Sequence, residues 1–171
     1  MGLVDRKLPS SATGSDFETR ATEQHHESLR LWLRMLTCSS LIETRIRQRL
    51  QSQFNTTLPR FDLMAQLERS PDGLKMGELS RRMMVTGGNV TGITDMLEKE
   101  GLVARGADLL DRRALRVKLT REGKRQFARM AGAHQQWVTD LFGGLDVRAK
   151  SQLGSLLGQL KRHIARRLNE R

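Results

Sequence analysis

The residues best suited to chemistry form a run of small polar side chains within positions 86–94 of the sequence. The run contains Thr86, Gly87, Gly88, Asn89, Thr91, Gly92 and Thr94. An asparagine can pair with both edge groups of adenine, and a threonine can meet a thymine methyl group or a phosphate. Glycines let a backbone come close, although each lowers helix propensity by roughly 1 kcal/mol. Free N–H groups in the first turn of a helix also bind phosphate. This pattern is typical of a surface that contacts DNA.

A second group of candidates is basic and lies mostly in a predicted hairpin. The basic candidates for DNA contact are Arg81, Arg112, Arg113 and Arg116. Asp111 precedes two of these arginines, and a carboxylate beside a guanidinium can orient it toward a narrow minor groove. The alternative is a solvated hairpin whose charges only keep an edge strand soluble. The helices that precede the hairpin favour the first interpretation.

The positions of apolar residues, turn residues and helix caps predict the elements that must hold these side chains. A helical pattern runs from 26 to 53, and Pro59 opens a second helix that ends near Glu68. The remaining elements are helices at 76–83, 87–100, 121–141 and 146–168, and strands at 102–105 and 115–119. Thr86, Thr120 and Asp146 are predicted N-caps, and Gly101 is a predicted helix stop.

This order of elements predicts a mainly α fold with a small β-hairpin. Helix, tight turn, helix and basic hairpin together form a winged helix-turn-helix. Residues 1–25 have no periodic pattern and are interpreted as a flexible N-terminal arm. Residues 26–171 are interpreted as a single domain.

The charge supports an anionic partner. Thirty Lys and Arg against 19 Asp and Glu leave a net charge of +11. The surplus is concentrated at 75–125 (12 basic, 7 acidic) and at 147–171 (7 basic, 1 acidic). Acidic membranes, acidic proteins or an anionic small molecule are alternatives to nucleic acid. No apolar run reaches the ~18 residues that a membrane helix needs.

Other classes of function find little support in the sequence. A single cysteine, Cys38, offers no internal disulfide and no metal framework. We therefore predict a cytoplasmic protein without metal or cofactor, and interpret Cys38 as a buried, inert thiol. A phosphate-binding glycine loop and a nucleophile elbow are both missing from the sequence, so an enzyme is not expected.

Several short motifs resemble those of the MarR family of transcriptional regulators. The segment that ends the DNA-contacting helix of this family is matched by Leu97-Glu98, Gly101-Leu102-Val103 and Arg105. Asp111 and Arg113 match its wing, and Leu119-Thr120 with Gly123 match the next element. The resemblance implies a homodimer with dimerisation helices at 26–53 and 121–171 and a winged helix-turn-helix at 57–120. It also implies binding to a palindromic double-stranded operator, usually as a repressor.

The segment VTGGNVTGITD is similar to a subgroup that controls the breakdown of aromatic acids such as hydroxycinnamates. That similarity implies an aromatic acid or its CoA thioester as effector. Family effectors bind between the dimerisation helices and the DNA-binding lobe. The ligand candidates there are Trp32, Arg34, Met35, Leu36, Ser39, Arg60 and Phe61. The alternative is that the apolar members belong to the core and the arginines are solvated.

The sequence also allows two other functions. The first is a redox-sensing regulator that uses Cys38, although the chain has no tyrosine of the kind that neighbours such thiols in related sensors. The second is a dimeric small-molecule carrier or protein-interaction module that does not bind DNA. The polar run at 86–94 and the arginines of the hairpin argue against the carrier.

Overall fold

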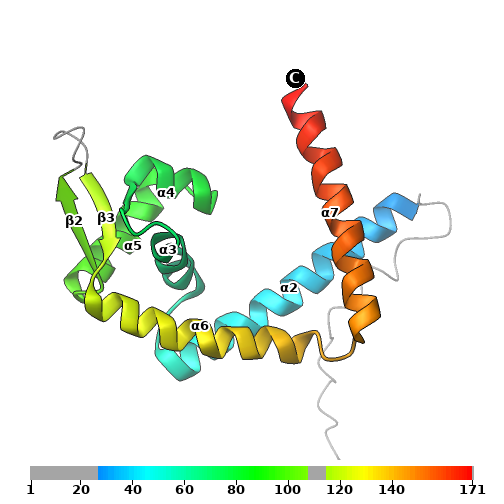
Figure 1. Cartoon of the computed structure of the whole chain (residues 1–171), viewed down its shortest axis with the longest axis horizontal. Coiled ribbons are helices and arrows are strands. Elements are labelled where there is room, and N and C mark those ends of the chain that lie inside the picture. The colour runs from blue at the N-terminus through cyan, green and yellow to red at the C-terminus, as the bar shows by residue number, and fades with distance from the viewer. Residues whose placement is uncertain (1–26, 108–114, 171) are drawn as a thin grey trace, which may run out of the picture. The chain divides into compact units, whose positions relative to one another are not determined.

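The structure is a computed structural model that describes residues 27–107 and 115–170 (Figure 1). Its elements are α2 (Glu27–Phe54), α3 (Leu58–Glu68), β1 (Leu74–Lys75), α4 (Met76–Met83), α5 (Gly87–Lys99), β2 (Val103–Ala107), β3 (Leu115–Leu119), α6 (Arg121–Leu141) and α7 (Val147–Asn169). The predicted fold class, mainly helical with a small β-hairpin, is confirmed. The predicted arm at 1–25 lies outside the described residues.

The chain divides into two compact units, residues 1–45 and 46–171. The described part of the first unit is the beginning of α2. Its apolar side chains are largely exposed within that unit, as Trp32 and Leu41 illustrate. The second unit contains the end of α2 and all other elements.

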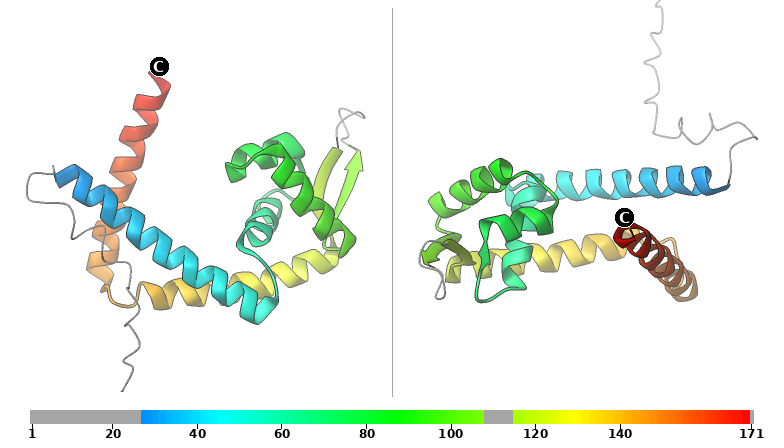
Figure 2. Two further views of the ribbon diagram at one scale, coloured as in Figure 1. Left: turned by 180° about the vertical axis from the view of Figure 1, so that it is seen from behind. Right: turned by 90° about the horizontal axis from the view of Figure 1, so that it is seen from above.

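The core of the second unit lies between three short helices and the sheet. Helices α3, α4 and α5 gather with the sheet at one end of α6 (Figure 2). Leu63, Leu79, Leu97 and Val117 are fully buried there, one from each of α3, α4, α5 and β3. The apolar stripes of the three helices and one face of β3 meet at this centre.

The sheet has three antiparallel strands in the order β1-β3-β2. Val103 pairs with Leu119, and Leu74 of β1 pairs with Val117. Strand β3 matches its prediction, whereas β2 continues to Ala107, two residues beyond the predicted end. Strand β1 was not predicted, because two residues are too few to show a period. We call β2, β3 and the segment between them the wing, residues 103–119.

Helix ends follow from local hydrogen bonding. The hydroxyl of Thr120 accepts from the N–H of Gly123, and a carboxylate oxygen of Asp146 accepts from that of Ala149, so these two predicted caps are confirmed. Thr86 is the N-cap residue of α5, but its side chain makes no capping hydrogen bond. Gly101 ends α5 with φ of +72°, and the N–H of Leu102 returns to the carbonyl of Leu97. This is the Schellman arrangement that favours glycine.

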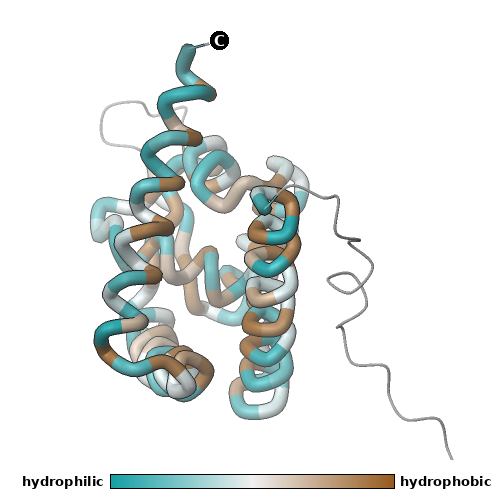
Figure 3. Tube along the Cα trace, turned by 90° about the vertical axis from the view of Figure 1, so that its right-hand side faces the viewer, coloured by the Kyte–Doolittle hydropathy of each residue, from teal (hydrophilic) through white to brown (hydrophobic). Residues whose placement is uncertain are grey.

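Helix α7 buries none of its residues within the second unit. Hydrophobic positions nevertheless recur along it, as Figure 3 shows for the helix that ends at the C-terminal label. The exposed apolar side chains include Val147, Leu156, Ile164 and Leu168. In the part of the chain that the structure describes, no helix combines the length and apolarity needed to cross a bilayer.

Candidate nucleic-acid interface

Helix α5 presents one face to solvent and buries the other. Gly87, Gly88, Asn89 and Thr91 are exposed at its N-terminal end, whereas Val90 is fully buried. The first turn therefore offers its free N–H groups and an amide side chain on the accessible face. These are the groups that bind phosphates and base edges.

Thr94 does not belong to the accessible face, and the prediction that it contacts DNA is wrong. Its exposed fraction is 0%, and its hydroxyl donates to the carbonyl of Val90 at 2.7 Å. The position lies four residues after Val90 and three before Leu97, on the buried stripe of the helix. A buried threonine hydroxyl at this position finds its hydrogen-bond acceptor in the preceding turn of the same helix.

The glycines of α5 are not required by the chain's own packing. A Cβ added at Gly87, Gly88 or Gly92 would have no neighbour within 4 Å. None of the three has a positive φ. Glycine weakens a helix, so three of them on one open face fit a surface that something outside the chain approaches closely.

The turn between α4 and α5 is held in an unusual conformation. Met84 has φ of 55°, and its side chain is 94% exposed. The hydroxyl of Ser80 donates to the carbonyl of Val85 at 2.6 Å and closes the turn. A left-handed non-glycine residue costs roughly 1–2 kcal/mol, so the surrounding contacts must hold this geometry.

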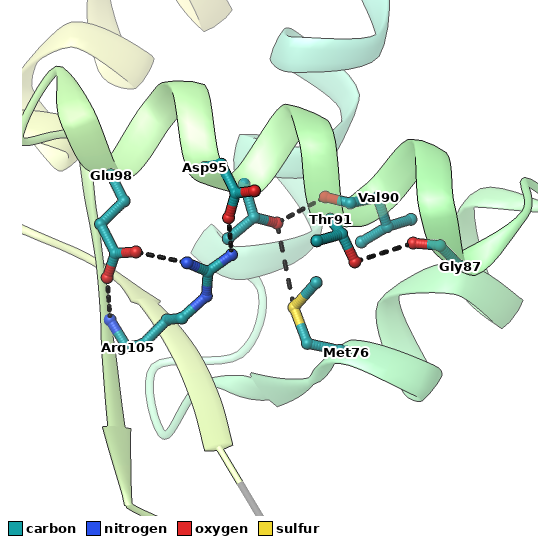
Figure 4. A network of polar contacts seen from close by, with 8 residues as sticks. Met76, Gly87, Val90, Thr91, Asp95, Glu98 and Arg105 are labelled. Carbon is teal, nitrogen blue, oxygen red and sulfur yellow. Dashed lines mark hydrogen bonds and ion pairs between the residues drawn. The ribbon is translucent and has the colours of Figure 1, made fainter.

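Arg105 joins the wing to α5 (Figure 4). Its guanidinium donates to the carboxylates of Asp95 and Glu98, and its backbone N–H donates to Glu98 Oε1 at 3.1 Å. The hydrogen bond to Asp95 is the main reason that the pKa of Arg105 is raised, and Glu98 adds to it against the opposing effect of burial. Two residues of the family motif, Glu98 and Arg105, thus form one contact between β2 and α5.

The other arginine candidates differ in their surroundings. Arg81 is exposed on α4. Arg116 is half-buried and donates to the carbonyl of Gly73 at 2.9 Å, so part of its guanidinium serves the fold. Asp111, Arg112 and Arg113 lie outside the described residues, and their role in DNA contact stays a prediction.

Gly123 has a structural role that the sequence pattern did not reveal. A Cβ at this position would lie 1.9 Å from the carbonyl oxygen of Leu102. That oxygen accepts the N–H of Thr120 at 3.0 Å, and the Thr120 hydroxyl donates to the carbonyl of Gly101 at 2.7 Å. Only glycine lets α6 start this close to the end of α5. The motif Leu119-Thr120 with Gly123 is therefore a joint between α5, the wing and α6.

The ligand candidates fall into both units. Trp32, Arg34, Met35, Leu36 and Ser39 belong to the first unit, where the Trp32 side chain is 55% exposed. Cys38 is also exposed, so its interpretation as a buried thiol is wrong. Helical periodicity cannot tell a core stripe from an apolar stripe that stays exposed among the described residues.

Phe61 and Arg60 belong to the second unit. Phe61 is buried, and the centroid of its ring lies 5.5 Å from that of Phe127 and 4.9 Å from that of His134. It is a core residue that packs α3 on α6. Arg60 forms an ion pair with Glu100, the C-cap residue of α5.

Arg60 also lines a cavity of about 490 Å³ that sequence reasoning missed. Its walls come from the end of α2, the turn that follows, α3, the end of α5 and α6. The lining residues are Ser52, Gln53, Phe54, Asn55, Thr56, Arg60, Met64, Glu100, Leu102, Gln126, Arg129 and Met130. Only Arg60 was predicted as a ligand residue, because the others are brought together by tertiary packing. Within residues 27–107 and 115–170 no three His, Cys, Asp or Glu side chains gather as metal ligands would.

The helix pair α4–α5 followed by the wing defines a winged helix-turn-helix protein. A profile of the MarR family matches residues 56–115. A MarR family transcriptional regulator from Silicibacter pomeroyi is 31% identical, with a TM-score of 0.69 over 80% of this chain and 94% of that one. The chain therefore belongs to the MarR family. It is a DNA-binding transcriptional regulator and not an enzyme.

Two further relatives agree with this family. The HTH-type transcriptional regulator PecS of Dickeya dadantii is 26% identical over 127 residues, 73% of this chain and 76% of PecS. The MarR family regulator Sco3205 from Streptomyces coelicolor was solved in complex with DNA. It is 26% identical, with a TM-score of 0.69 over 80% of this chain and 86% of Sco3205.

Proposed function

We propose that the protein is a homodimeric repressor that an aromatic acid or its CoA thioester releases from a palindromic operator. The observation that carries the DNA-binding part is the open, glycine-rich face of α5, beside which Arg105 holds the wing. Asn89 and Thr91 read base edges, while the N–H groups of Gly87 and Gly88 bind a phosphate. Sco3205, which was solved with DNA, has the same fold.

The wing provides the second contact of this proposal. Arg112 and Arg113 enter the minor groove, and Arg81 and Arg116 bind phosphates. Because these contacts release counterions, the operator affinity should fall steeply as salt rises. Arg113→Ala should weaken binding by roughly 1–3 kcal/mol. Arg69→Ala, an exposed charge change at the end of α3, is the control.

The homodimer rests on apolar surface that each unit leaves uncovered. In the second unit, α7 carries a stripe of exposed leucines and isoleucine on a helix with no buried residue. In the first unit, the beginning of α2 exposes Leu29, Leu31, Trp32, Leu36 and Leu41. Exposed apolar surface of this extent marks an interaction site. Two reading helices about one DNA turn apart then match the two halves of a palindrome.

The effector part of the proposal rests on the similarity of residues 85–95 to regulators of aromatic-acid breakdown. An aromatic acyl group would pack on Trp32, Met35 and Leu36, with Ser39 as a hydrogen-bond partner and Arg34 near an acidic group. A ligand that binds better to one spacing of the reading helices shifts the dimer toward that spacing. Release follows when that spacing no longer fits the operator.

Fluorescence anisotropy with labelled DNA from the gene's own upstream region tests the proposal. The DNA-bound protein is titrated with 4-coumaroyl-CoA and, separately, with 4-coumarate. Release by either compound supports an effector-released repressor. Tight binding that neither compound changes would remove the effector assignment, and no binding at low salt would remove the DNA-binding regulator. Asn89→Ala is expected to weaken the complex without lowering thermal stability.

A further inference from the structure

We propose that Met84, in the turn between α4 and α5, is a site of reversible oxidation whose sulfoxide weakens operator binding. The oxidant is a hydroperoxide. The sulfur supplies an electron pair and bonds to the terminal oxygen, the O–O bond breaks, and the other oxygen takes the proton and leaves as water or an alcohol. The inference rests on the DNA-binding part of the proposed function and does not depend on the effector. It differs from redox sensing by Cys38, because no thiol takes part.

The first reason is the accessibility of this side chain. Met84 is 94% exposed, more than any other large apolar side chain among residues 27–107 and 115–170. Met96 is 49% exposed, whereas Met64 and Met130 are buried. The other methionines that the structure describes are half-buried. Because a hydroperoxide must touch the sulfur in order to oxidise it, Met84 should react first among these methionines.

The second reason is that the turn does not use the Met84 side chain. The backbone of Met84 is left-handed, with φ of 55° and ψ of 36°. Its N–H donates to the carbonyl of Arg81 at 3.3 Å, and the N–H of Val85 donates to the carbonyl of Ser80 at 3.2 Å. The Ser80 hydroxyl donates in turn to the carbonyl of Val85. These bonds involve only main-chain groups and the Ser80 side chain, so a sulfoxide at Met84 changes the surface of the turn and leaves its fold.

The third reason is the place of Met84 beside the phosphate site of the proposed complex. It stands two residues before Thr86, the N-cap residue of α5, whose hydroxyl makes no capping hydrogen bond. The N–H groups of the first turn are therefore left for a phosphate of DNA. A sulfoxide oxygen is polar and accepts hydrogen bonds, whereas a thioether is only a weak acceptor. Next to these N–H groups and to the exposed Arg81, the sulfoxide repels the phosphate and competes with it for hydrogen-bond donors.

Peptide mass spectrometry and fluorescence anisotropy of the same samples test the two halves of the proposal. The protein carries Cys38→Ser, so that no thiol is oxidised, and the folded protein is treated with hydrogen peroxide. Mass spectrometry should find sulfoxide at Met84 before Met96 and long before Met64. Operator affinity should fall about fivefold or more, the equivalent of one lost hydrogen bond. Methionine sulfoxide reductases A and B with dithiothreitol should restore it, because together they reduce both sulfoxide epimers.

Three variants of this Cys38→Ser parent separate the sulfur of Met84 from the rest of the protein. Met84→Leu keeps an apolar side chain that peroxide does not oxidise, so it should bind the operator like the untreated parent and keep that affinity in peroxide. Met84→Gln carries an amide in place of the sulfoxide, so it should bind about fivefold more weakly without any oxidant. Met96→Leu is the matched control and should stay as sensitive to peroxide as the parent. Circular dichroism and thermal unfolding confirm that each variant is folded.

The proposal is wrong if Met84 is converted to sulfoxide and operator affinity stays unchanged, or if Met84→Leu loses affinity in peroxide as the parent does. Oxidation of Met84 no faster than that of the buried Met64 would overturn it as well. Each of these results leaves the DNA-binding regulator in place, because the untreated protein binds its operator in all of them. Failure of the untreated protein to bind its operator at low salt would instead remove the proposed function itself, and this inference with it.

Discussion

Replacing Arg105 by alanine should loosen the wing and weaken DNA binding. The side chain is the only group of β2 for which the structure describes ion pairs with α5, and it reaches both Asp95 and Glu98. Its removal takes away these ion pairs between the wing and α5. It also leaves Asp95 without its ion pair, while Glu98 keeps the hydrogen bond from the backbone N–H of residue 105. Asp95 is 57% exposed on the helix that is proposed to face DNA. Both effects act against binding to phosphate.

The size of the effect follows from exposure. The pair with Glu98 is half-buried, and a charge-assisted bond there contributes about 1–2 kcal/mol. The pair with Asp95 is more exposed and contributes about 0.2–1 kcal/mol. Together they predict a loss of about 1.2–3 kcal/mol in the free energy of unfolding. In a chain of this length, that loss lowers the Tm by about 2–12 °C.

The assay compares thermal unfolding and operator anisotropy at one protein concentration. Arg125→Ala is the matched control, because its ion pair with Glu122 joins side chains that are 68% and 46% exposed and should contribute little. Asp95→Asn combined with Arg105→Ala should recover part of the lost DNA affinity, since it removes one unpaired charge. The reasoning is refuted if Arg105→Ala lowers the Tm no more than Arg125→Ala does.

Three further predictions follow from individual contacts. Gly123→Ala should lower the free energy of unfolding by about 1–3 kcal/mol or more, because its Cβ would collide with the carbonyl of Leu102. Gly132→Ala, on the open side of α6, should not lower it. Equal denaturation midpoints for the two variants would contradict this prediction. Burial lowers the pKa of His134, so the folded state disfavours its protonation. The free energy of unfolding should therefore decline as pH falls below about 6.5, the pKa of histidine in the unfolded chain. His134→Gln should flatten that decline when it is measured by urea titration. An equal dependence on pH in the variant and the wild type would contradict this prediction. Thr94→Val should change the free energy of unfolding by about 1 kcal/mol and leave operator affinity intact. Asn89→Ala should weaken operator binding and leave the free energy of unfolding unchanged. Loss of DNA binding in Thr94→Val would show that Thr94 belongs to the DNA-contacting face after all.

Local sequence was sufficient for most of the elements. Apolar residues three and four apart identified the helices, and alternation identified β3. The caps at Thr120 and Asp146 and the stop at Gly101 could be predicted because each depends on residues within one turn. The motif residues also identified the family, because a motif is recognised from the order and spacing of its residues along the chain and not from their contacts.

Tertiary structure decided which groups are available for binding. Thr94 and Asn89 are equally small and polar in sequence, yet one is buried and the other exposed. The pairing of Arg105 with α5, the close approach at Gly123 and the cavity around Arg60 each join residues of different elements. Exposure, desolvation and ion pairing depend on distances in space between such residues. Periodicity reports only neighbours along one helix or strand, so it could place these side chains on elements but could not assign their partners.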